Sequence, residues 1–490
     1  MIRSSKPFLL ERYHRIVDDA AAFEVFLKRP LPRCIWTHPL RTRPEKLARR
    51  LEEDGYRLTP LTGFPGAFRV ASEPRPLGGH WTYQAGLFHI QEAASMVPVR
   101  LLSPRPGMRI MDLCAAPGNK TVQAAAAMEN RGTVVANDLR YHRMASIRMH
   151  IDRLGMVNVS TTCSDGGSYP RKAGLFDAVL VDVPCSCEGT SRKNPDILQR
   201  PVPGRERLLL RQKWLLERAV RLCRPGGRIV YSTCTYDPEE NEGVLDAVLR
   251  TMPDRLEMRP ASIPGLRADP GLTAWGPKRY LPDLHMAMRL WPHLNDSGGF
   301  FAAVLKRTGD LFSEPEPSPP ICEAENGQAA ESENRLFPNP GRVHALLASR
   351  FGIAPSAFDG FCLLERGRRQ IFLVAADHRP PRHPQPAAGL PLLHLSMKTP
   401  KLTTAGALLM GAHARRNVID VDGEQRDRYL HRRRFALHSA QLPDPASDGH
   451  VLIRHRGVLL GVGVFRSASM TVESLYPKRF AAAAADSLRG

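Results

Sequence analysis

Short apolar runs alternate with amphipathic segments along the middle of this 490-residue chain. The short runs predict buried strands, and the longer segments, whose apolar residues recur at helical spacing, predict helices. Helices are expected at Arg140–Leu154 and Arg205–Cys223, and a strand over Phe300–Leu305 is expected to join the sheet edge. The other predicted strands are Arg109–Leu113, Thr133–Asn137, Val157–Thr162, Phe176–Asp182 and Gly227–Ser232. This alternation is typical of a parallel sheet covered on both faces, so residues 101–308 are predicted to form a Rossmann-like α/β domain.

Residues 1–100 are predicted to form a smaller domain. Apolar positions across Tyr13–Leu27 repeat at helical spacing, and a strand over Arg33–Thr37 and a basic helix over Pro44–Leu51 follow. The stretch Gly79–Gln84 leads into a further helix through Gln91–Met96. Its aromatic and amide side chains could contact a nucleotide or pack at a domain junction. We expect this domain to bind RNA or to act as a lid.

Composition changes sharply after the predicted sheet. Residues 309–335 are rich in Pro, Ser and Glu, which predicts a flexible acidic linker. Residues 336–378, with a helix near Pro340–Phe351 and a strand over Gln370–Ala375, are predicted to form a small connecting domain. A Pro-rich spacer from Arg379 to Pro391 is expected to separate that domain from the C-terminal part.

Residues 391–490 are predicted to form a β-rich module around one helix, Thr403–Ala414. Basic residues gather at Arg415-Arg416 and at His431–Arg434. A small β-rich module with basic loops is a common form of RNA-binding domain, although a solvated charged face explains the clusters nearly as well. RNA binding by this module is therefore a prediction that needs a test.

The charge balance indicates a polyanionic partner. The chain has 69 Lys and Arg against 49 Asp and Glu, a net charge of +20, which favours RNA or DNA over an anionic membrane. No apolar run is long enough to span a bilayer, and the first residues lack the apolar core of a signal peptide, so we expect a cytoplasmic protein. Nine cysteines in that compartment argue against a disulfide framework. No obligate protein partner is evident.

Candidate cofactor residues follow the first strands of the predicted sheet. The loop after the first strand consists of Cys114, Ala115, Ala116, Pro117, Gly118, Asn119 and Lys120. It has the spacing neither of a phosphate loop nor of a dinucleotide fingerprint. Asp138 ends the next strand and Asp165 lies just after the third, where carboxylates can accept ribose hydroxyls or meet an adenine edge. Either acid alone would more often be a helix N-cap. Together with the loop they predict S-adenosylmethionine, which carries no phosphates.

Two cysteines mark the expected reaction centre. Cys185 and Cys234 close the fourth and fifth strands, so both should lie at one edge of the sheet. Carbon-5 of cytosine is a poor nucleophile, and a thiolate that adds to carbon-6 makes it reactive toward a methyl donor. Asp182 can hold the base while charge develops, and Lys120 is a candidate cation for stabilising the thiolate. Catalytic roles are thus predicted for Asp182 and both thiols, but this chemistry leaves open which thiol attacks.

A zinc site is the alternative for these cysteines. Cys185, Cys187 and Cys234, with a histidine such as His293, offer suitable ligand atoms. No Cys-x-x-Cys pair supports this interpretation, so we predict no metal. His293 and Asp296 are expected to shape the loop before the last strand. The remaining cysteines receive only a structural role; they are Cys34, Cys163, Cys223, Cys322 and Cys362.

Several motifs resemble those of the Sun/nucleolar-protein family of RNA cytosine-5 methyltransferases. They are Asp112–Thr121, Asp182–Thr190, Arg192–Asp196, Tyr231–Thr235 and Arg289–His293. The resemblance covers about Gly79 to Arg307, and the paired cysteines are its most specific part. The whole layout is similar to the bacterial small-subunit ribosomal methyltransferase F type. It implies a PUA-like C-terminal fold and a cytidine in small-subunit ribosomal RNA as the substrate.

The resemblance also divides the work between the thiols. Cys234 matches the family's nucleophile, which would form a covalent adduct with carbon-6, and Cys185 matches the cysteine that helps to release the product. The implied cofactor contacts are the Cys114–Lys120 loop together with Asp138, Asp165 and Asp182. Transfer RNA as the substrate stays open, and so does a non-catalytic RNA-binding factor for ribosome assembly.

One position departs from the family pattern. Cys187 stands where the family usually has Gly. A side chain there would be strained if the position needs a positive φ, and it adds a third thiol beside the site. The release step is the part of the expected mechanism that this departure affects.

Overall fold

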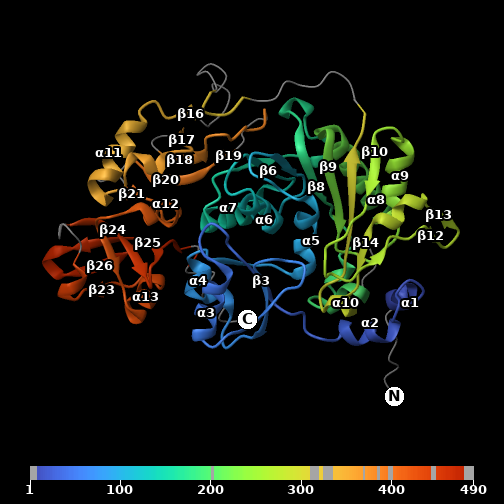
Figure 1. Ribbon diagram of the computed structural model, residues 1–490, viewed down its shortest axis with the longest axis horizontal. Helices are drawn as coiled ribbons and strands as arrows, with labels where there is room; N and C mark the ends of the chain where they lie inside the picture. The colour runs from blue at the N-terminus through green and yellow to red at the C-terminus, as the bar shows by residue number, and fades with distance from the viewer. Residues whose placement is uncertain are drawn as a thin grey trace.

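The computed structural model describes residues 8–199, 204–309, 319–323, 335–367, 370–382, 387–395, 401–442, 448–478 and 480. Within these residues a ten-stranded sheet forms the centre, in the order β11-β14-β15-β9-β8-β5-β6-β7-β19, with β10 paired to β15 (Figure 1). The parallel strands are β5 (Arg109–Asp112), β6 (Thr133–Asp138), β7 (Val159–Cys163), β8 (Phe176–Asp182) and β9 (Cys223–Thr233). The predicted Rossmann-like core is confirmed.

Helices cover both faces of this sheet. Leu180 of β8 packs in a cluster with residues of α5 (Ala93–Leu102), α6 (Asn119–Ala127) and α7 (Tyr141–Leu154). The next residue, Val181, packs in a second cluster with α8 (Arg205–Leu222) and α9 (Glu242–Thr251). Successive side chains of a strand point to opposite faces, and both faces are covered here. This explains why the strands read as nearly continuous apolar runs.

The strand predicted over Phe300–Leu305 joins the sheet but does not end it. It is β15 (Phe300–Arg307), antiparallel to β9. Short strands extend the sheet beyond it, namely β10 (Leu256–Arg259), β11 (Asp269–Pro270) and β14 (Met288–Leu290). The same part of the chain also contains α10 (Pro292–Asn295) and a separate hairpin of β12 (Ala274–Trp275) and β13 (Lys278–Arg279). Strands of two to four residues carry too little alternation to be recognised in the sequence.

The N-terminal part forms a separate four-stranded sheet in the order β2-β3-β1-β4. Its elements are β1 (Cys34–Thr37), α3 (Pro44–Glu53), β2 (Arg57–Pro60), β3 (Ala67–Ser72), α4 (Trp81–Gln84) and β4 (Phe88–Ile90). The helix predicted across Tyr13–Leu27 is two helices, α1 (Phe8–Tyr13) and α2 (Ala20–Leu27). They are separate because the Asp19 side chain accepts a hydrogen bond from Ala22 N at 2.8 Å and caps α2.

Beyond the core, the structure differs from the predicted boundaries. A five-stranded sheet consists of β16 (Arg335–Leu336), β17 (Phe361–Arg366), β18 (Gln370–Ala375), β20 (Leu390–His394) and β21 (Lys401–Leu402), beside α11 (Pro340–Phe351). Residues 390–402 thus pair with the connecting segment, although we expected a boundary at 391. Within the expected spacer, β19 (Ala387–Ala388) pairs with β7 and so lies against the core sheet. Backbone pairing outweighs the Pro-rich composition there.

Cys322 and Cys362 are bonded as a disulfide, where the sequence assigned each only a structural role. Most of the predicted acidic linker, residues 310–318 and 324–334, lies outside the described residues. No helix in the described ranges is both long and apolar enough to cross a bilayer.

The C-terminal part is β-rich, as predicted. Its sheet has the order β22-β24-β25-β26-β23, built from β22 (Val418–Asp420), β23 (Phe435–Ala436), β24 (Gly449–His455), β25 (Val458–Arg466) and β26 (Thr471–Ser474). The predicted helix is α12 (Thr404–Met410). A second helix, α13 (Gly423–Leu430), was missed, although Asp422 and Gln425 form a capping box at its start.

Candidate active site

The candidate site lies at the carboxyl edge of the parallel strands. From β5 the chain adds β6 and β7 on one side and then crosses to place β8 and β9 on the other. Ligands of open α/β sheets bind in the crevice where the strand order reverses in this way. Asp112, Asp138 and Asp182 end β5, β6 and β8, and Cys234 follows β9. The topology therefore brings the predicted acids and the predicted nucleophile to one edge.

The predicted cofactor loop joins β5 to α6. Gly118 has a φ of 105°, and a Cβ atom there would lie 3.0 Å from Ile147 Cα, so glycine fits this tight approach. Ala116 N donates to Asp138 Oδ2 at 3.2 Å, and Arg140 N donates to Asp138 Oδ1 at 3.0 Å. Asp138 thus holds the loop against the end of β6. Asp138 therefore holds the residue that precedes α7 and also lies beside the cofactor loop.

Asp165 occupies a more open position. Its carboxylate accepts a hydrogen bond from Gly167 N at 3.0 Å, and its side chain is 54% exposed. It lies on the rim of a cavity of about 780 Å³, together with Ser168, Arg211 and Trp214. The local contact is that of a turn cap. Its predicted contact with adenine stays a prediction.

Asp182 and Lys120 form the charged centre of the site. Lys120 Nζ donates to Asp182 Oδ2 at 2.8 Å, and Ser232 Oγ donates to Asp182 Oδ1 at 2.7 Å. Burial works against the charge of Lys120, but the neighbouring Asp182 carboxylate outweighs it and raises the pKa of Lys120. Lys120 therefore stays protonated and fixes the orientation of Asp182.

Asp112 lies deeper, beneath this pair. Thr121 Oγ1 donates to Asp112 Oδ2 at 2.6 Å, while Oδ1 is buried without a hydrogen-bond partner in the described part of the chain. Burial raises the pKa of Asp112 to about 7. An acceptor without a donor at the end of β5 marks a position where a hydrogen-bond donor of a ligand could bind.

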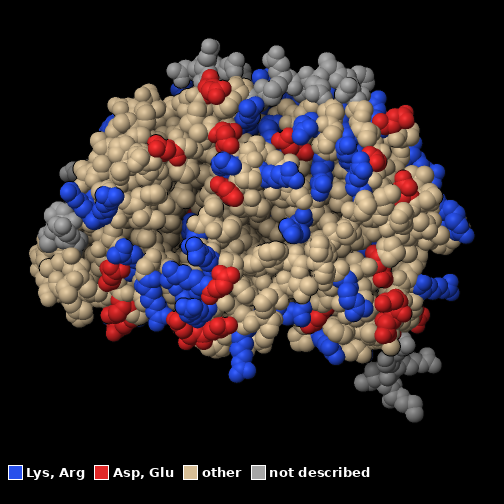
Figure 2. Space-filling model, in the orientation of Figure 1, with Lys and Arg blue, Asp and Glu red and all other residues tan. Residues whose placement is uncertain are grey.

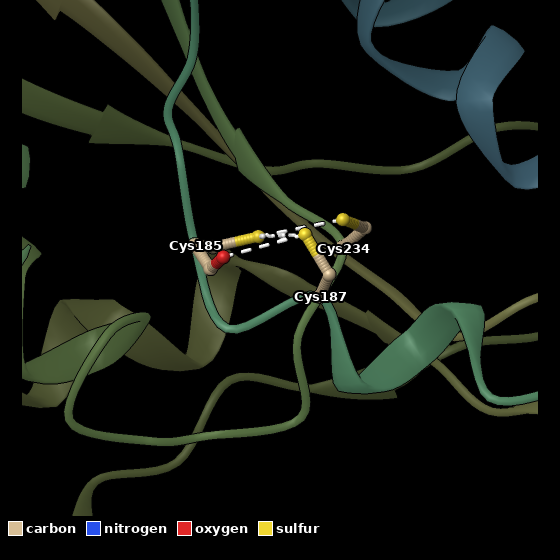
Figure 3. Close-up of side chains that lie close together, drawn as sticks. All are labelled: Cys185, Cys187 and Cys234. Atoms are coloured by element: carbon tan, nitrogen blue, oxygen red, sulfur yellow. Dashed lines mark hydrogen bonds between the residues drawn. The ribbon is translucent and has the colours of Figure 1, made fainter. Parts of the chain in front are cut away.

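The two predicted thiols meet, and a third joins them (Figure 3). Cys185 Sγ lies 3.4 Å from Cys234 Sγ and 3.9 Å from Cys187 Sγ. All three sulfur atoms lie within 4.8 Å of one another, and each residue is partly exposed. The cluster is therefore compact and open to a ligand.

Cys187 adopts the positive-φ backbone conformation in which a residue other than glycine is strained. Its φ is 61°, in the left-handed region that favours glycine. Cys187 Sγ donates to the Cys185 carbonyl oxygen at 3.3 Å, and Thr190 Oγ1 donates to the Cys187 carbonyl oxygen at 2.8 Å. These contacts hold a side chain in a position where most residues would be strained. The position accepts cysteine at some cost in backbone energy.

The three thiols do not share one acidity. Hydrogen bonds from the thiols of Cys185 and Cys234 stabilise the thiolate of Cys187 and lower the pKa of Cys187. The pKa of Cys185 is raised by its hydrogen bonds to the other two thiols and by burial. The pKa of Cys234 is raised too: its hydrogen bond with Cys185 favours the thiolate, but the one with Cys187, burial and nearby negative charge outweigh it. The first negative charge in the cluster therefore lies on Cys187.

A buried polar chain behind the thiols was missed by the sequence analysis. Tyr13 OH donates to Glu188 Oε2 at 2.6 Å, Thr235 Oγ1 donates to the same oxygen at 3.0 Å, and the hydroxyls of Ser186 and Thr235 lie 2.6 Å apart. The chain links α1 to both cysteine loops. Glu188 stands directly after the Cys185–Cys187 segment, which was the only signal available.

The two residues expected to shape the loop before β15 do so. His293 Nε2 lies 2.6 Å from Asp18 Oδ1. Asp296 accepts from Arg192 Nη2 at 2.8 Å and from Arg69 Nη1 at 3.2 Å. His293 is absent from the group of metal-ligand atoms that the described residues form at the thiols. The zinc set that included His293 is thus not assembled.

Fold and site together define a methyltransferase of the Rossmann-like class with paired thiols. Residues 99–306 match the family model for the 16S rRNA methyltransferase RsmB/F, and the chain belongs to this family. Membership confirms the resemblance drawn from the paired-cysteine motifs. It places the chain among methyltransferases that use S-adenosylmethionine.

Similar proteins support this assignment along much of the chain. The chain is 35% identical over 321 residues to ribosomal RNA small subunit methyltransferase F of Erwinia tasmaniensis, a match spanning 64% of this chain and 65% of that protein. It is 34% identical over 343 residues to the protein of the same name from Escherichia coli O81, spanning 66% and 69%. The crystal structure of a methyltransferase homolog from Pyrococcus horikoshii superimposes with a TM-score of 0.53 at 29% identity, covering 61% of this chain and 99% of that one.

Proposed function

We propose that this chain is a cytoplasmic S-adenosylmethionine-dependent RNA methyltransferase that converts a cytidine of small-subunit ribosomal RNA to 5-methylcytidine. The observation that carries the proposal is the 3.4 Å distance between the sulfur atoms of Cys185 and Cys234, at the sheet edge that also holds the cofactor loop. The names of its relatives favour ribosomal RNA over transfer RNA.

The residues at the strand ends suit the cofactor. When bound, S-adenosylmethionine supplies a methyl group on a positively charged sulfur. We assign its binding to the Cys114–Lys120 loop, with Asp138, Asp165 and Asp182 around it. The unpartnered oxygen of Asp112 and the carboxylates at successive strand ends form a set of acceptors that fits an adenosine with a charged amino-acid tail.

Cys234 is assigned as the nucleophile. Its thiol releases its proton to the solvent that reaches the partly exposed cluster, and the sulfur adds to carbon-6 of the cytosine. The new carbon–sulfur bond breaks the double bond between carbon-5 and carbon-6 and moves its electron pair to carbon-5. We assign Asp182, oriented by Lys120 at 2.8 Å, to accept a hydrogen bond from the amino group of the base and to hold nitrogen-3 while charge develops there. That contact steadies the ring while charge spreads over it.

Cys185 is assigned to product release. Once carbon-5 carries the methyl group, its proton must leave and the bond between Cys234 and carbon-6 must break, so that the ring double bond re-forms. The sulfur of Cys185 lies beside that bond because it is 3.4 Å from Cys234 Sγ. We assign Cys185 to assist this elimination, in which the carbon-5 proton leaves and the Cys234 sulfur departs as a thiolate.

The flanking parts are assigned to RNA binding. Lys and Arg side chains gather densely on the face near α3, α4 and α13 (Figure 2). There Arg50 Nη2 donates to the Arg456 carbonyl oxygen at 2.9 Å, and Tyr476 OH donates to Gln84 Oε1 at 2.7 Å. These contacts join the N-terminal and C-terminal parts into one basic surface, which suits a folded RNA.

Two substitutions test the proposal. Purified protein is incubated with small-subunit ribosomal RNA and labelled S-adenosylmethionine, and methylation is mapped by bisulfite sequencing. We expect Cys234→Ala to lose methylation and to form no covalent complex, and Cys185→Ala to accumulate a covalent protein–RNA complex that survives denaturing gels. Cys163→Ser, which changes an exposed thiol outside the cluster, is the matched control. Carbon-5 methylation by the Cys234 variant would overturn the assignment.

A further inference from the structure

The thiol cluster has one sulfur atom more than the proposed chemistry requires for bond making and bond breaking. Its measured sulfur–sulfur distances are 3.4 and 3.9 Å, and the third is below 4.8 Å. A zinc ion bound to thiolates at about 2.3 Å sets the sulfur atoms about 3.8 Å apart in tetrahedral geometry and about 4.0 Å apart in trigonal geometry. The two measured distances differ from these values by a few tenths of an ångström, and the third exceeds the tetrahedral value by at most about 1 Å, so small side-chain adjustments let the three sulfur atoms share one ion.

Cys187 creates this geometry. Residues two apart in an extended strand have side chains roughly 7 Å apart. The left-handed backbone at Cys187 turns the chain back, so its sulfur atom lies 3.9 Å from that of Cys185 and 3.3 Å from the Cys185 carbonyl oxygen. A Cys-x-Cys pair becomes a chelating pair through this turn, and β9 supplies the third sulfur atom from Cys234.

The surroundings select the kind of ion. Three sulfur ligands favour soft, thiophilic ions over magnesium or calcium. The neighbouring carboxylate of Asp182 is already paired with Lys120 at 2.8 Å, so it does not complete a hard oxygen site. All three cysteines are partly exposed, which leaves room for water as a fourth ligand.

We propose that Cys185, Cys187 and Cys234 form a three-thiolate site for a thiophilic divalent ion of the zinc type, and that the bound ion switches the methyltransferase off. Binding replaces three S–H bonds by three metal–sulfur bonds and releases up to three protons to solvent, with no oxidant or reductant required. The sulfur atoms of Cys185 and Cys234 cannot bind the ion and act on a base at the same time, so the bound ion stops methylation. The inhibition of methylation rests on the proposed function, whereas the metal site itself does not.

Cobalt(II) binding to the full chain tests the site without RNA or cofactor. Reduced protein freed of metal by a chelator is titrated with Co²⁺, and absorption from thiolate-to-cobalt charge transfer is recorded. We expect one ion per chain, displacement by Zn²⁺ and tighter binding at higher pH. Cys187→Gly should weaken binding by at least about tenfold, and because glycine suits the positive φ, this variant should keep the loop conformation.

A control variant and an inhibition measurement complete the test. Cys163→Ser removes an exposed thiol and should bind cobalt as the wild type does. Zn²⁺ should inhibit methylation by the wild type at concentrations at least about tenfold lower than for Cys187→Gly, each measured against its own chelator-treated rate. Binding that ignores the Cys187 substitution, or a spectrum without the charge-transfer band, would overturn the metal site. Methylation without cobalt binding would refute this inference alone, and cobalt binding without methylation would refute only the proposed function.

Discussion

The sulfur atoms of Cys185 and Cys234 lie 3.4 Å apart although 49 residues separate them in the chain. The sheet register produces this contact, because Asp182 of β8 pairs with Ser232 of β9, and Cys185 and Cys234 lie three and two residues after these paired positions. Gly189 N also donates to the Cys234 carbonyl oxygen at 2.9 Å and ties the two loops together. The position of the thiols is therefore a property of the strand pairing.

Replacing Lys120 by methionine tests the charged centre. The substitution keeps the length and apolar body of the side chain but removes the charge that orients Asp182 at 2.8 Å. Because Asp182 would then be a partly buried carboxylate without its charged partner, the single-turnover methylation rate should fall by on the order of 100-fold. Thermal unfolding should show that the variant still folds.

Lys213→Met is the control for that substitution. Lys213 is partly exposed on α8 and pairs with Glu217, one helical turn away, at 3.8 Å. Exposed pairs of this kind contribute little, so its rate should match the wild type. A Lys120→Met enzyme that works within about twofold of the wild type would show that Asp182 needs no partner.

Replacing Tyr13 by phenylalanine tests the polar chain behind the thiols. The change deletes one hydroxyl, and Glu188 loses the donor that lies 2.6 Å from its carboxylate. A buried acceptor left short of a donor costs about 1–3 kcal/mol, so the free energy of unfolding should fall by that amount. Tyr141→Phe, at a side chain that is 84% exposed, is the control and should change nothing.

Long regular elements could be predicted from the sequence, and short ones could not. The strands Phe176–Asp182 and Gln370–Ala375 and the helix Pro340–Phe351 have the predicted ends, because each has a full apolar pattern with turn or cap signals at its limits. The break between α1 and α2 depends on one capping side chain, Asp19. The pairing of β19 with β7 depends on contacts across 226 residues, which no local pattern encodes.

The candidate site divides in the same way. Strand-end positions follow from the order of strands, so the meeting of Cys185 and Cys234 could be predicted. The positive φ of Cys187 could only be stated as a condition, because backbone angles depend on the whole loop. The hydrogen bond between Tyr13 and Glu188 joins residues 175 positions apart, and the sequence around either residue contains no signal that predicts this contact.

Replacing Asp112 by asparagine tests its raised pKa. Burial raises that pKa from 3.8 to about 7, so the folded protein holds a proton there that the unfolded chain has lost. The contribution of this group to stability is thus present below pH 4 and is lost as the pH rises to about 7. The asparagine side chain would keep an acceptor for Thr121 without the charge.

The Asp112→Asn protein should therefore gain stability over the wild type as the pH rises from 4 to 8, by on the order of 4 kcal/mol at the upper end. Thermal unfolding of both proteins at several pH values measures this difference. Midpoints that stay a constant distance apart across the range would contradict a raised pKa at this position.

The basic residues after α13 distinguish an RNA-binding face from a solvated one. Arg433 and Arg434 are exposed and follow α13, whereas the Arg432 side chain is hydrogen-bonded to the Tyr476 carbonyl oxygen. If both exposed guanidinium groups contact phosphates, the double alanine variant should bind ribosomal RNA more weakly at low salt. The slope of log affinity against log salt should become shallower by about 0.9 for each phosphate that is no longer neutralised.

Arg250→Ala with Arg259→Ala is the matched control, since Asp246 and Glu257 neutralise those arginines at 2.8 and 2.7 Å. Equal affinities and equal slopes for all three proteins would assign Arg433 and Arg434 to a solvated face.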